Sequence, residues 1–196
     1  MSGGRILLVR HGETAWSLSG QHTGRTDIPL TPNGEAKAAA LRPRLSGVHP
    51  DLILCSPLSR AQRTAELAGL WPVQTDADLL EWDYGAWEGR TTAQIRESLA
   101  DPEWTVWSTK ANVAAAPGEQ PEDVAMRAHR VLARCDPVLA AGGTCALVAH
   151  GHFLRILTAT WLGLPARDGR LWVLDAGAVS ALGFEREQRV ILAWNS

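Results

Sequence analysis

Short apolar runs mark the strands that this chain is expected to form. The first run, Ile6 to Val9, has no polar interruption, and similar runs recur along the chain. Runs of this kind are typical of strands buried on both faces, as in a parallel sheet. The predicted strands are residues 5–10, 52–55 and 144–149, followed by closing strands at 172–174, 179–184 and 190–194.

Helices are predicted between these strands. Thr31 followed by Pro32 is typical of a helix start, with Thr31 as the N-cap, and Ser56 followed by Pro57 repeats the pattern. The predicted helices are residues 32–45, about 57–70, 92–99, 122–139 and 153–162. Strands that alternate with helices indicate an α/β fold, here a three-layer sandwich with a mostly parallel sheet.

The length of the chain predicts a single domain over residues 1–196, because a chain of this size can bury a sizeable core. One segment departs from the alternation of strands and helices. Residues 88–120 contain Pro102, Pro117 and a loose alanine run beside the one helical stretch. We interpret this segment as an insertion in which the chain leaves the sheet and forms a lid.

The overall charge gives no indication of a nucleic acid as partner. Lys and Arg total 19 against 21 for Asp and Glu, so no excess positive charge is present for a polyanion. The three cysteines lack metal-ligand spacing and are interpreted as buried thiols. Residues 1–4 lead directly into the first strand, and no stretch approaches about 18 apolar residues. We therefore expect a cytoplasmic protein without membrane contact.

Two of the predicted strands end in the same pair of residues. His11–Gly12 follows the predicted strand 5–10, and His150–Gly151 follows the predicted strand 144–149. The carboxyl ends of parallel strands form the ligand crevice of an open α/β sheet, so we expect the two imidazoles to meet there. Free backbone N–H groups at the two glycines would also face this crevice.

Two arginines are predicted at the same edge of the sheet. Arg10 precedes His11, and Arg60 lies in the first turn of the helix that follows the strand 52–55. Its guanidinium and the N-terminus of that helix would both face an anion. Two imidazoles, two guanidinium groups and free N–H groups together indicate a phosphate site.

At these residues the chain resembles a known family. The run Leu8-Val9-Arg10-His11-Gly12-Glu13-Thr14 is similar to the signature of the histidine phosphatase superfamily, the phosphoglycerate-mutase-like proteins. Further matches follow in family order and span nearly the whole chain. They are Thr23-Gly24 with Asp27-Ile28-Pro29-Leu30-Thr31, then Ser56-Pro57-Leu58-Ser59-Arg60-Ala61, then Glu81-Trp82-Asp83-Tyr84-Gly85-Ala86-Trp87-Glu88-Gly89, and Ala149-His150-Gly151-His152.

The resemblance implies a role for each matching residue. It implies that His11 is the nucleophile, that Arg10, Arg60 and His150 hold the phosphate oxygens, and that Glu81 is the proton donor, with Glu13 or Asp83 as alternatives that could share the acid role. The implied phosphate and substrate contacts are Arg10, Gly12, Ser17, Thr23, Gly24, Arg60, Tyr84, His150 and Gly151. Ser17 departs from the family pattern, since many relatives have Asn there. No cofactor is implied.

The remaining histidines give weaker indications. His152, next but one to His150, could suggest a zinc pair, but no third ligand is clustered with them, so we expect no metal. We interpret His22, His49 and His129 as surface or loop residues. Glu81 lies between apolar neighbours in the sequence, and apolar surroundings are expected for its carboxyl group.

Three functions are compatible with a phosphate site: a phosphatase, a phosphoglycerate mutase and a non-catalytic phosphate-binding module. A mutase retains a phosphorylated acid between two steps and needs extra cations, yet the segment 88–120 has only Arg90, Arg96 and Lys110. Residues 16–24 and 174–177 resemble the sedoheptulose-bisphosphatase-like and mycobacterial broad-specificity phosphatases. We therefore expect a metal-independent phosphatase that hydrolyses a small sugar phosphate or related metabolite. A homodimer that pairs through the strand 190–194 is a further possibility.

Overall fold

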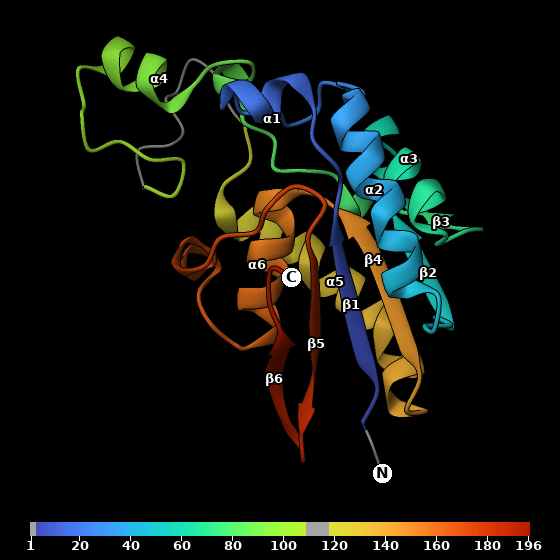
Figure 1. Cartoon of the computed structure of the whole chain (residues 1–196). Coiled ribbons are helices and arrows are strands. Elements are labelled where there is room, and N and C mark those ends of the chain that lie inside the picture. Colours follow the sequence, from blue (N-terminus) through green and yellow to red (C-terminus); the bar gives the residue numbers. More distant parts are fainter. Residues whose placement is uncertain (1–2, 109–117) are drawn as a thin grey trace.

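A six-stranded sheet forms the centre of the molecule in the computed structural model, which describes residues 3–108 and 118–196 (Figure 1). The strand order is β3-β2-β4-β1-β5-β6. The strands are β1 (Arg5–Arg10), β2 (Leu52–Cys55), β3 (Gln74–Thr75), β4 (Thr144–Ala149), β5 (Val179–Glu185) and β6 (Gln188–Ala193). The first four pair in parallel, and β5 and β6 add antiparallel pairings. The predicted mostly parallel sheet is confirmed.

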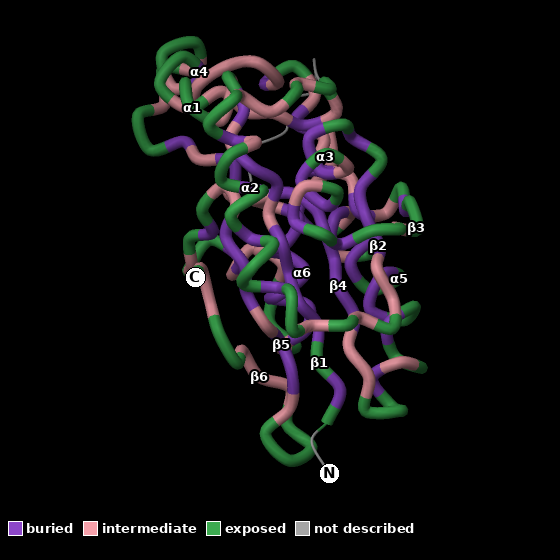
Figure 2. The backbone as a smooth tube through the Cα atoms, turned by 45° about the vertical axis from the view of Figure 1, so that its right-hand side comes forward, coloured by how far each residue is buried: buried purple, intermediate pink, exposed green. Residues whose placement is uncertain are grey.

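Helices cover both faces of this sheet, because alternate side chains of each strand point to opposite faces. From β1, Leu7 and Val9 pack in one apolar cluster with residues of α2 (Pro32–Leu45) and α3 (Ser59–Ala68). Ile6 and Leu8 pack in a second cluster with α5 (Pro121–Ala140) and α6 (Gly151–Trp161). The central strands β1 and β4 are accordingly buried over most of their length (Figure 2). The result is the predicted three-layer arrangement.

The start of α2 is confirmed and the start of α3 is not where the sequence places it. The Thr31 hydroxyl accepts a hydrogen bond from the amide of Gly34 at 3.0 Å and caps α2. In contrast, α3 begins at Ser59 and has no cap from Ser56. Instead, the carboxylate of Asp27 accepts hydrogen bonds from both the amide and the hydroxyl of Ser59, at 2.9 and 2.8 Å.

The predicted strand 172–174 is wrong. These residues follow a 3-10 helix, η3 (Ala166–Leu171), and pair with no strand among those described. Their carbonyl groups are instead used by side chains, since Val173 accepts from the Trp194 indole and Leu174 from the Arg10 guanidinium. Shorter elements were not predicted at all. They are α1 (Ala15–Ser19), β3, η1 (Ala77–Leu79) and η2 (Gly85–Trp87).

The segment predicted as a lid begins beyond the carboxyl ends of the parallel strands, beside α1 (Figure 1). Its predicted helix is present as α4 (Thr92–Leu99). The following residues fold back, with Trp104 buried and the Trp107 ring 5.4 Å from that of Trp82. Residues 109–117, with Lys110, lie outside the described residues. The function of this segment as a lid stays a prediction.

Three smaller expectations concern burial and the sheet edge. All three cysteines are buried and free, as predicted. Over the described ranges, none of the helices combines the length and the apolar character needed to cross a bilayer. The strand β6 lies at one end of the sheet, where Leu192 is exposed. Its pairing with a second copy of the chain stays a prediction.

Candidate active site

The two strand-end histidines lie side by side. Because β1 and β4 are parallel neighbours, the amide of His11 donates to the carbonyl of Ala149 at 3.0 Å, one residue before His150. The ring centroids of His11 and His150 are 5.1 Å apart. Both imidazoles are almost fully buried. The sheet therefore brings together two residues that are 139 positions apart in the sequence.

The hydrogen bonds of His11 decide which of its nitrogens is free. Nδ1 lies 2.7 Å from the carbonyl oxygen of Gly12, and a carbonyl can only accept, so Nδ1 carries the proton. Nε2 is then left with its lone pair. Burial lowers the pKa of His11 well below its usual value, and the charges of Arg10 and Arg60 lower it further. The imidazole is therefore neutral at neutral pH.

The imidazole of His150 is oriented by partners on both nitrogens. Nδ1 accepts from Nε of Arg60 at 3.2 Å, so the proton is on Nε2, which donates to the Ser56 hydroxyl at 2.7 Å. Burial and the nearby Arg60 charge lower the pKa of His150 well below its usual value. Ser56, which the sequence suggested as a helix cap, thus fixes the tautomer of His150.

Arg60 is completely buried behind this pair of imidazoles. Besides His150, its guanidinium contacts the loop that follows α1. Nη1 donates to the carbonyl of Thr26 and Nη2 to that of Gly24, each at 2.9 Å. Arg60 therefore connects α3, β4 and this loop.

Arg10 lies over the first turn of α6. Its Nη1 donates to the carbonyl of Leu174, and its Nε is buried without a hydrogen-bond partner among the described residues. An added Cβ at Gly151 would lie 3.2 Å from the guanidinium carbon of Arg10. The glycine therefore makes room for the arginine. As the first residue of α6, Gly151 also has an amide outside the helix's own hydrogen-bond pattern.

A cavity of about 210 Å³ opens in front of His11. It is lined by Arg10, His11, Ser17, Gly20, Gln21, His22, Thr23, Glu81, Tyr84, Gly151, His152, Arg155 and Leu174. Seven of these residues were predicted for the site. Four other predicted residues do not line the cavity: Gly12, Gly24, Arg60 and His150.

The amides of Gly12 and Gly24 are already used by other partners. The Gly12 amide donates to the Thr64 hydroxyl at 3.0 Å, so the free N–H group predicted at Gly12 is wrong. A Cβ at Gly12 would lie 2.5 Å from the carbonyl oxygen of Gly34, and this close approach explains the glycine. The Gly24 amide donates to the Glu88 carboxylate at 3.0 Å.

The hydroxyl of Ser17 has local partners too. It accepts from the amide of Thr14 at 2.9 Å and donates to the carbonyl of the same residue at 3.0 Å. Together with the reciprocal bond from the Ser17 amide, this forms the capping box of α1. Ser17 therefore contributes to the cavity wall while its hydroxyl stabilises the short helix.

Glu81 lies in the cavity wall, and its surroundings differ from those predicted. Oε1 accepts from the amides of Trp82 and Phe153 at 2.9 and 2.8 Å, and Oε2 accepts from the amide of His152 at 3.1 Å. The expected apolar surroundings are therefore wrong. Two of the three donors are free amides of the first turn of α6, so the N-terminus of this helix fixes the carboxyl group.

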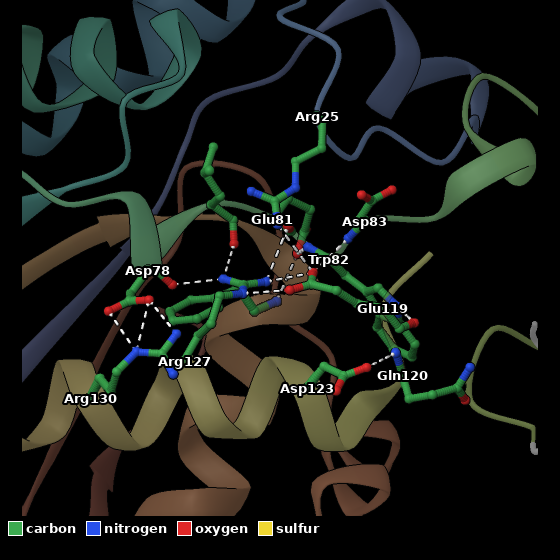
Figure 3. Close-up of polar contacts among 12 residues, drawn as sticks. Arg25, Asp78, Glu81, Trp82, Asp83, Glu119, Gln120, Asp123, Arg127 and Arg130 are labelled. Atoms are coloured by element: carbon green, nitrogen blue, oxygen red, sulfur yellow. Dashed lines mark hydrogen bonds and ion pairs between the residues drawn. The ribbon is translucent and has the colours of Figure 1, made fainter. Parts of the chain in front are cut away.

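A partly buried ion pair supports the segment that carries Glu81 (Figure 3). Arg127, on α5, contacts both carboxylate oxygens of Glu119, with distances of 2.7 and 2.8 Å. Its Nη1 also donates to the carbonyl of Leu80 at 2.7 Å. Glu119 in turn accepts from the amide of Asp83 at 2.9 Å and pairs with Arg25 at 3.4 Å. The pair therefore holds the backbone on both sides of Glu81.

The two alternative acids lie elsewhere. The Glu13 carboxylate accepts from the Thr31 hydroxyl at 2.7 Å and from the Asn33 amide group at 3.0 Å. Asp83 accepts from the amide of Gly85 at 2.9 Å. Neither carboxylate lines the cavity, so the geometry favours Glu81 over both.

Six cavity residues were not predicted for the site: Gly20, Gln21, His22, His152, Arg155 and Leu174. Three of them carry titratable side chains. His22, interpreted as a surface or loop residue, lies in the cavity wall with its ring 5.0 Å from that of Tyr84, and burial lowers its pKa to about 4. Nδ1 of His152 lies 2.5 Å from the Tyr84 hydroxyl. Arg155 lies one helical turn beyond Gly151, a spacing that places both on one face of α6 and could have indicated it. His49 and His129 are exposed, as expected.

The fold defines a phosphoglycerate-mutase-like α/β protein, with two imidazoles paired at the carboxyl ends of β1 and β4. The chain belongs to the histidine phosphatase superfamily (branch 1), whose family model matches residues 6–196. It is 38% identical over 187 residues to an acid phosphatase of Mycobacterium tuberculosis, covering 94% of this chain and 89% of that protein. It is 35% identical over 189 residues to the sedoheptulose 1,7-bisphosphatase of Saccharomyces cerevisiae, covering 82% and 68%.

A solved structure shows the same fold. The product of a Mycobacterium tuberculosis open reading frame superposes with a TM-score of 0.87 at 37% sequence identity, covering 98% of this chain and 97% of that one. Family membership and fold thus agree along nearly the whole chain.

Proposed function

We propose that this protein is a metal-independent phosphatase that hydrolyses small phosphate monoesters through a phosphohistidine intermediate on His11. The observation that carries this proposal is the state of His11 in the cavity wall: a neutral imidazole whose proton is held on Nδ1 by the Gly12 carbonyl. Such an imidazole offers Nε2 as a nucleophile. The names of the acid phosphatase and bisphosphatase relatives agree with a phosphatase.

The reaction has two steps. Nε2 of His11 attacks phosphorus, and the bond from phosphorus to the ester oxygen breaks as the phosphorus–nitrogen bond forms. An alkoxide leaves poorly, so the Glu81 carboxyl group gives its proton to that oxygen. In the second step Glu81 takes a proton from water, whose oxygen attacks phosphorus and releases His11 and inorganic phosphate. The protons of the two steps balance.

Positive and hydrogen-bonding groups hold the three remaining phosphate oxygens. Arg10 lies in the cavity wall, the His150 ring centroid lies 5.1 Å from that of His11, and Arg60 donates to His150. In the bound state we expect the Arg60 guanidinium to turn part of its donors from the loop carbonyls to phosphate. Loss of one such fixed contact typically lowers the rate by about a hundredfold to a thousandfold.

The described arginines of the inserted segment do not supply the extra cations that a mutase needs to retain a sugar acid. Arg90 stacks on Trp87 and donates to the carbonyl of Gln94, and Arg96 donates to the carbonyl of Trp104. Neither lines the cavity. The inserted segment, as far as the described residues cover it, therefore contributes no cation that would retain a phosphorylated acid between two steps.

The proposal is tested with p-nitrophenyl phosphate, with and without a chelator, on the wild type and His11→Ala. We expect release of phosphate that the chelator does not change and that the substitution abolishes. Activity that the chelator removes, or that persists in His11→Ala, would contradict the proposal. With 3-phosphoglycerate and a trace of 2,3-bisphosphoglycerate, we expect free phosphate, whereas accumulation of 2-phosphoglycerate would indicate a mutase.

A further inference from the structure

Arg155 presents a second guanidinium group to the cavity. Its Nε donates to the carbonyl of Gly169 in η3 at 2.8 Å, and the guanidinium carbon lies 4.8 Å from the centroid of the Trp107 ring. Gly169 belongs to η3 and Trp107 to the inserted segment, and neither residue lines the cavity itself. These contacts use one nitrogen and one face of the guanidinium and fix its orientation.

The charge of Arg155 is not neutralised by a protein partner. Within residues 3–108 and 118–196, no carboxylate forms an ion pair with Arg155, and its terminal nitrogens donate no hydrogen bond. Glu81 is the single carboxylate among the described residues of the cavity wall, and its oxygens already accept three backbone hydrogen bonds. A partly buried guanidinium with free donors is a binding site for an anion.

The position of Arg155 separates it from the group that His11 would attack. Arg10 lies over Gly151, the first residue of α6, and Arg155 follows four residues later on the same face. One helical turn, about 5.4 Å, therefore separates the two positions along α6. Arg10 lies beside His11 at the end of β1, whereas the anchors of Arg155 lie in η3 and the inserted segment. A phosphate ester with its phosphoryl group at His11 would extend towards Arg155.

Electrostatics agree with this geometry. Burial lowers the pKa of Arg155, Glu81 and Tyr84 counteract the shift, and the charge of Arg10 lowers the pKa further. The two guanidinium charges of the cavity wall therefore repel each other, and a second anion bound at Arg155 would offset this repulsion.

We propose that Arg155 binds a second anionic group of the substrate, so that the preferred substrates are small phosphate esters carrying a carboxylate or a second phosphate besides the phosphoryl group transferred to His11. This inference rests on the proposed phosphatase function and specifies its substrate class. The cation that would bind this second anion comes from α6, whereas Arg90 and Arg96 of the inserted segment do not line the cavity.

The test compares substrates that differ in the second anion. Glycerol 3-phosphate is paired with 3-phosphoglycerate, which adds a carboxylate, and fructose 6-phosphate with fructose 1,6-bisphosphate, which adds a phosphate. We expect the wild type to prefer the second member of at least one pair. Arg155→Met should lower kcat/KM for that member by roughly tenfold to a hundredfold, mainly through KM, and change the first member by less than about threefold.

Two further variants separate recognition from a structural role. Arg155→Lys keeps the charge and should retain part of the preference. Arg167→Met is the matched control. Arg167 lies in η3 and donates to the carbonyl of Trp107 at 2.7 Å, but it does not line the cavity. It loosens the same region and should leave the preference unchanged.

The inference would be overturned if the wild type showed no preference in either pair. It would equally be overturned if Arg155→Met lowered kcat/KM for both members alike, or if Arg167→Met removed the preference to the same extent. Phosphate release from all four substrates would still support the phosphatase in these cases. Failure of the phosphatase itself would appear as no phosphate released from any of them.

Discussion

At the scale of single residues, proton positions decide the chemistry of the site. The carbonyl of Gly12 keeps the proton of His11 on Nδ1, and Arg60 keeps that of His150 on Nε2. Burial and nearby arginines keep both imidazoles neutral. One neutral imidazole can then act as the nucleophile and the other as a hydrogen-bond donor, although the two are chemically the same side chain.

Burial of neutral imidazoles makes stability depend on pH. The pKa values of His11, His22, His150 and His152 are all lowered from 6.5, that of His22 to about 4. Below about pH 6.5 the unfolded chain binds protons that the folded chain does not. The stabilisation is therefore fully present above pH 6.5 and is lost as the pH falls towards 4. Urea unfolding between pH 7.5 and pH 4.5 should show a falling free energy of unfolding.

Substitutions at two histidines check the origin of this dependence. His22→Gln should make the loss of stability between pH 6.5 and pH 4.5 shallower, because one buried imidazole is removed. His49→Gln, at an exposed position, should leave the slope unchanged. A free energy of unfolding that stays constant or rises on acidification would contradict the assignment of neutral imidazoles.

Gly151 offers a second test at this scale. A Cβ at this position would lie 3.2 Å from the Arg10 guanidinium carbon, so Gly151→Ala should displace Arg10 and lower kcat/KM by roughly tenfold or more. Its stability should be unchanged or higher, since alanine is the better helix former. Gly47→Ala is the control, because nothing lies within 4 Å of the added Cβ. Equal activity of the two variants would contradict this role of Gly151.

The sequence predicts the residues at strand ends better than those that loops bring in. His11, Arg10 and His150 follow from the sheet, because parallel strands end at one edge. The position of His22 depends on how the loop after α1 packs against Tyr84, which no periodicity encodes. Arg155 was missed because only its spacing of four residues from Gly151 indicates its position, and it belongs to none of the matching motifs.

At the scale of elements, the N-terminus of α6 organises the site. Its first turn supplies Gly151 beneath Arg10, and its amides bind Glu81. The helix itself and its length were predictable from apolar periodicity. The apolar segment 172–174 was predicted as a strand and is not one. The strand β1 pairs with β4 on one side and β5 on the other, so no free edge is left on β1 for a further strand.

The Glu119–Arg127 pair gives a prediction for the segment around Glu81. Glu119→Gln removes the charge opposite a nearly buried arginine, which should cost about 1–3 kcal/mol of unfolding free energy. The backbone at Asp83 and Leu80 should loosen, and kcat should fall by more than KM changes, since Glu81 is expected to act in the chemical step. Steady-state kinetics and urea unfolding measure both effects.

A surface pair provides the control for this variant. Glu122→Gln breaks the exposed contact of Glu122 with Arg167, an interaction worth at most about 1 kcal/mol, and should leave kcat unchanged. If Glu119→Gln lost stability but kept the wild-type kcat, the ion pair would support the fold without positioning Glu81.

At the scale of the whole molecule, the sheet collects one site from distant parts of the chain. His11 directly follows β1, Arg60 lies in α3, His150 directly follows β4, and Glu81 lies in the segment after β3. Sequence pattern predicts this topology, since strands alternate with helices. It does not predict the arrangement of the inserted segment, whose tryptophans and prolines form no regular period.

The account depends centrally on transfer of the phosphoryl group to His11. Its most direct test is rapid mixing of the wild type with substrate, an alkaline quench and mapping of phosphopeptides by mass spectrometry. We predict a phosphate on the peptide that contains His11, labile to acid, and none there in His11→Ala. Turnover of the wild type without an adduct on His11, or with the adduct on another residue, would contradict the account.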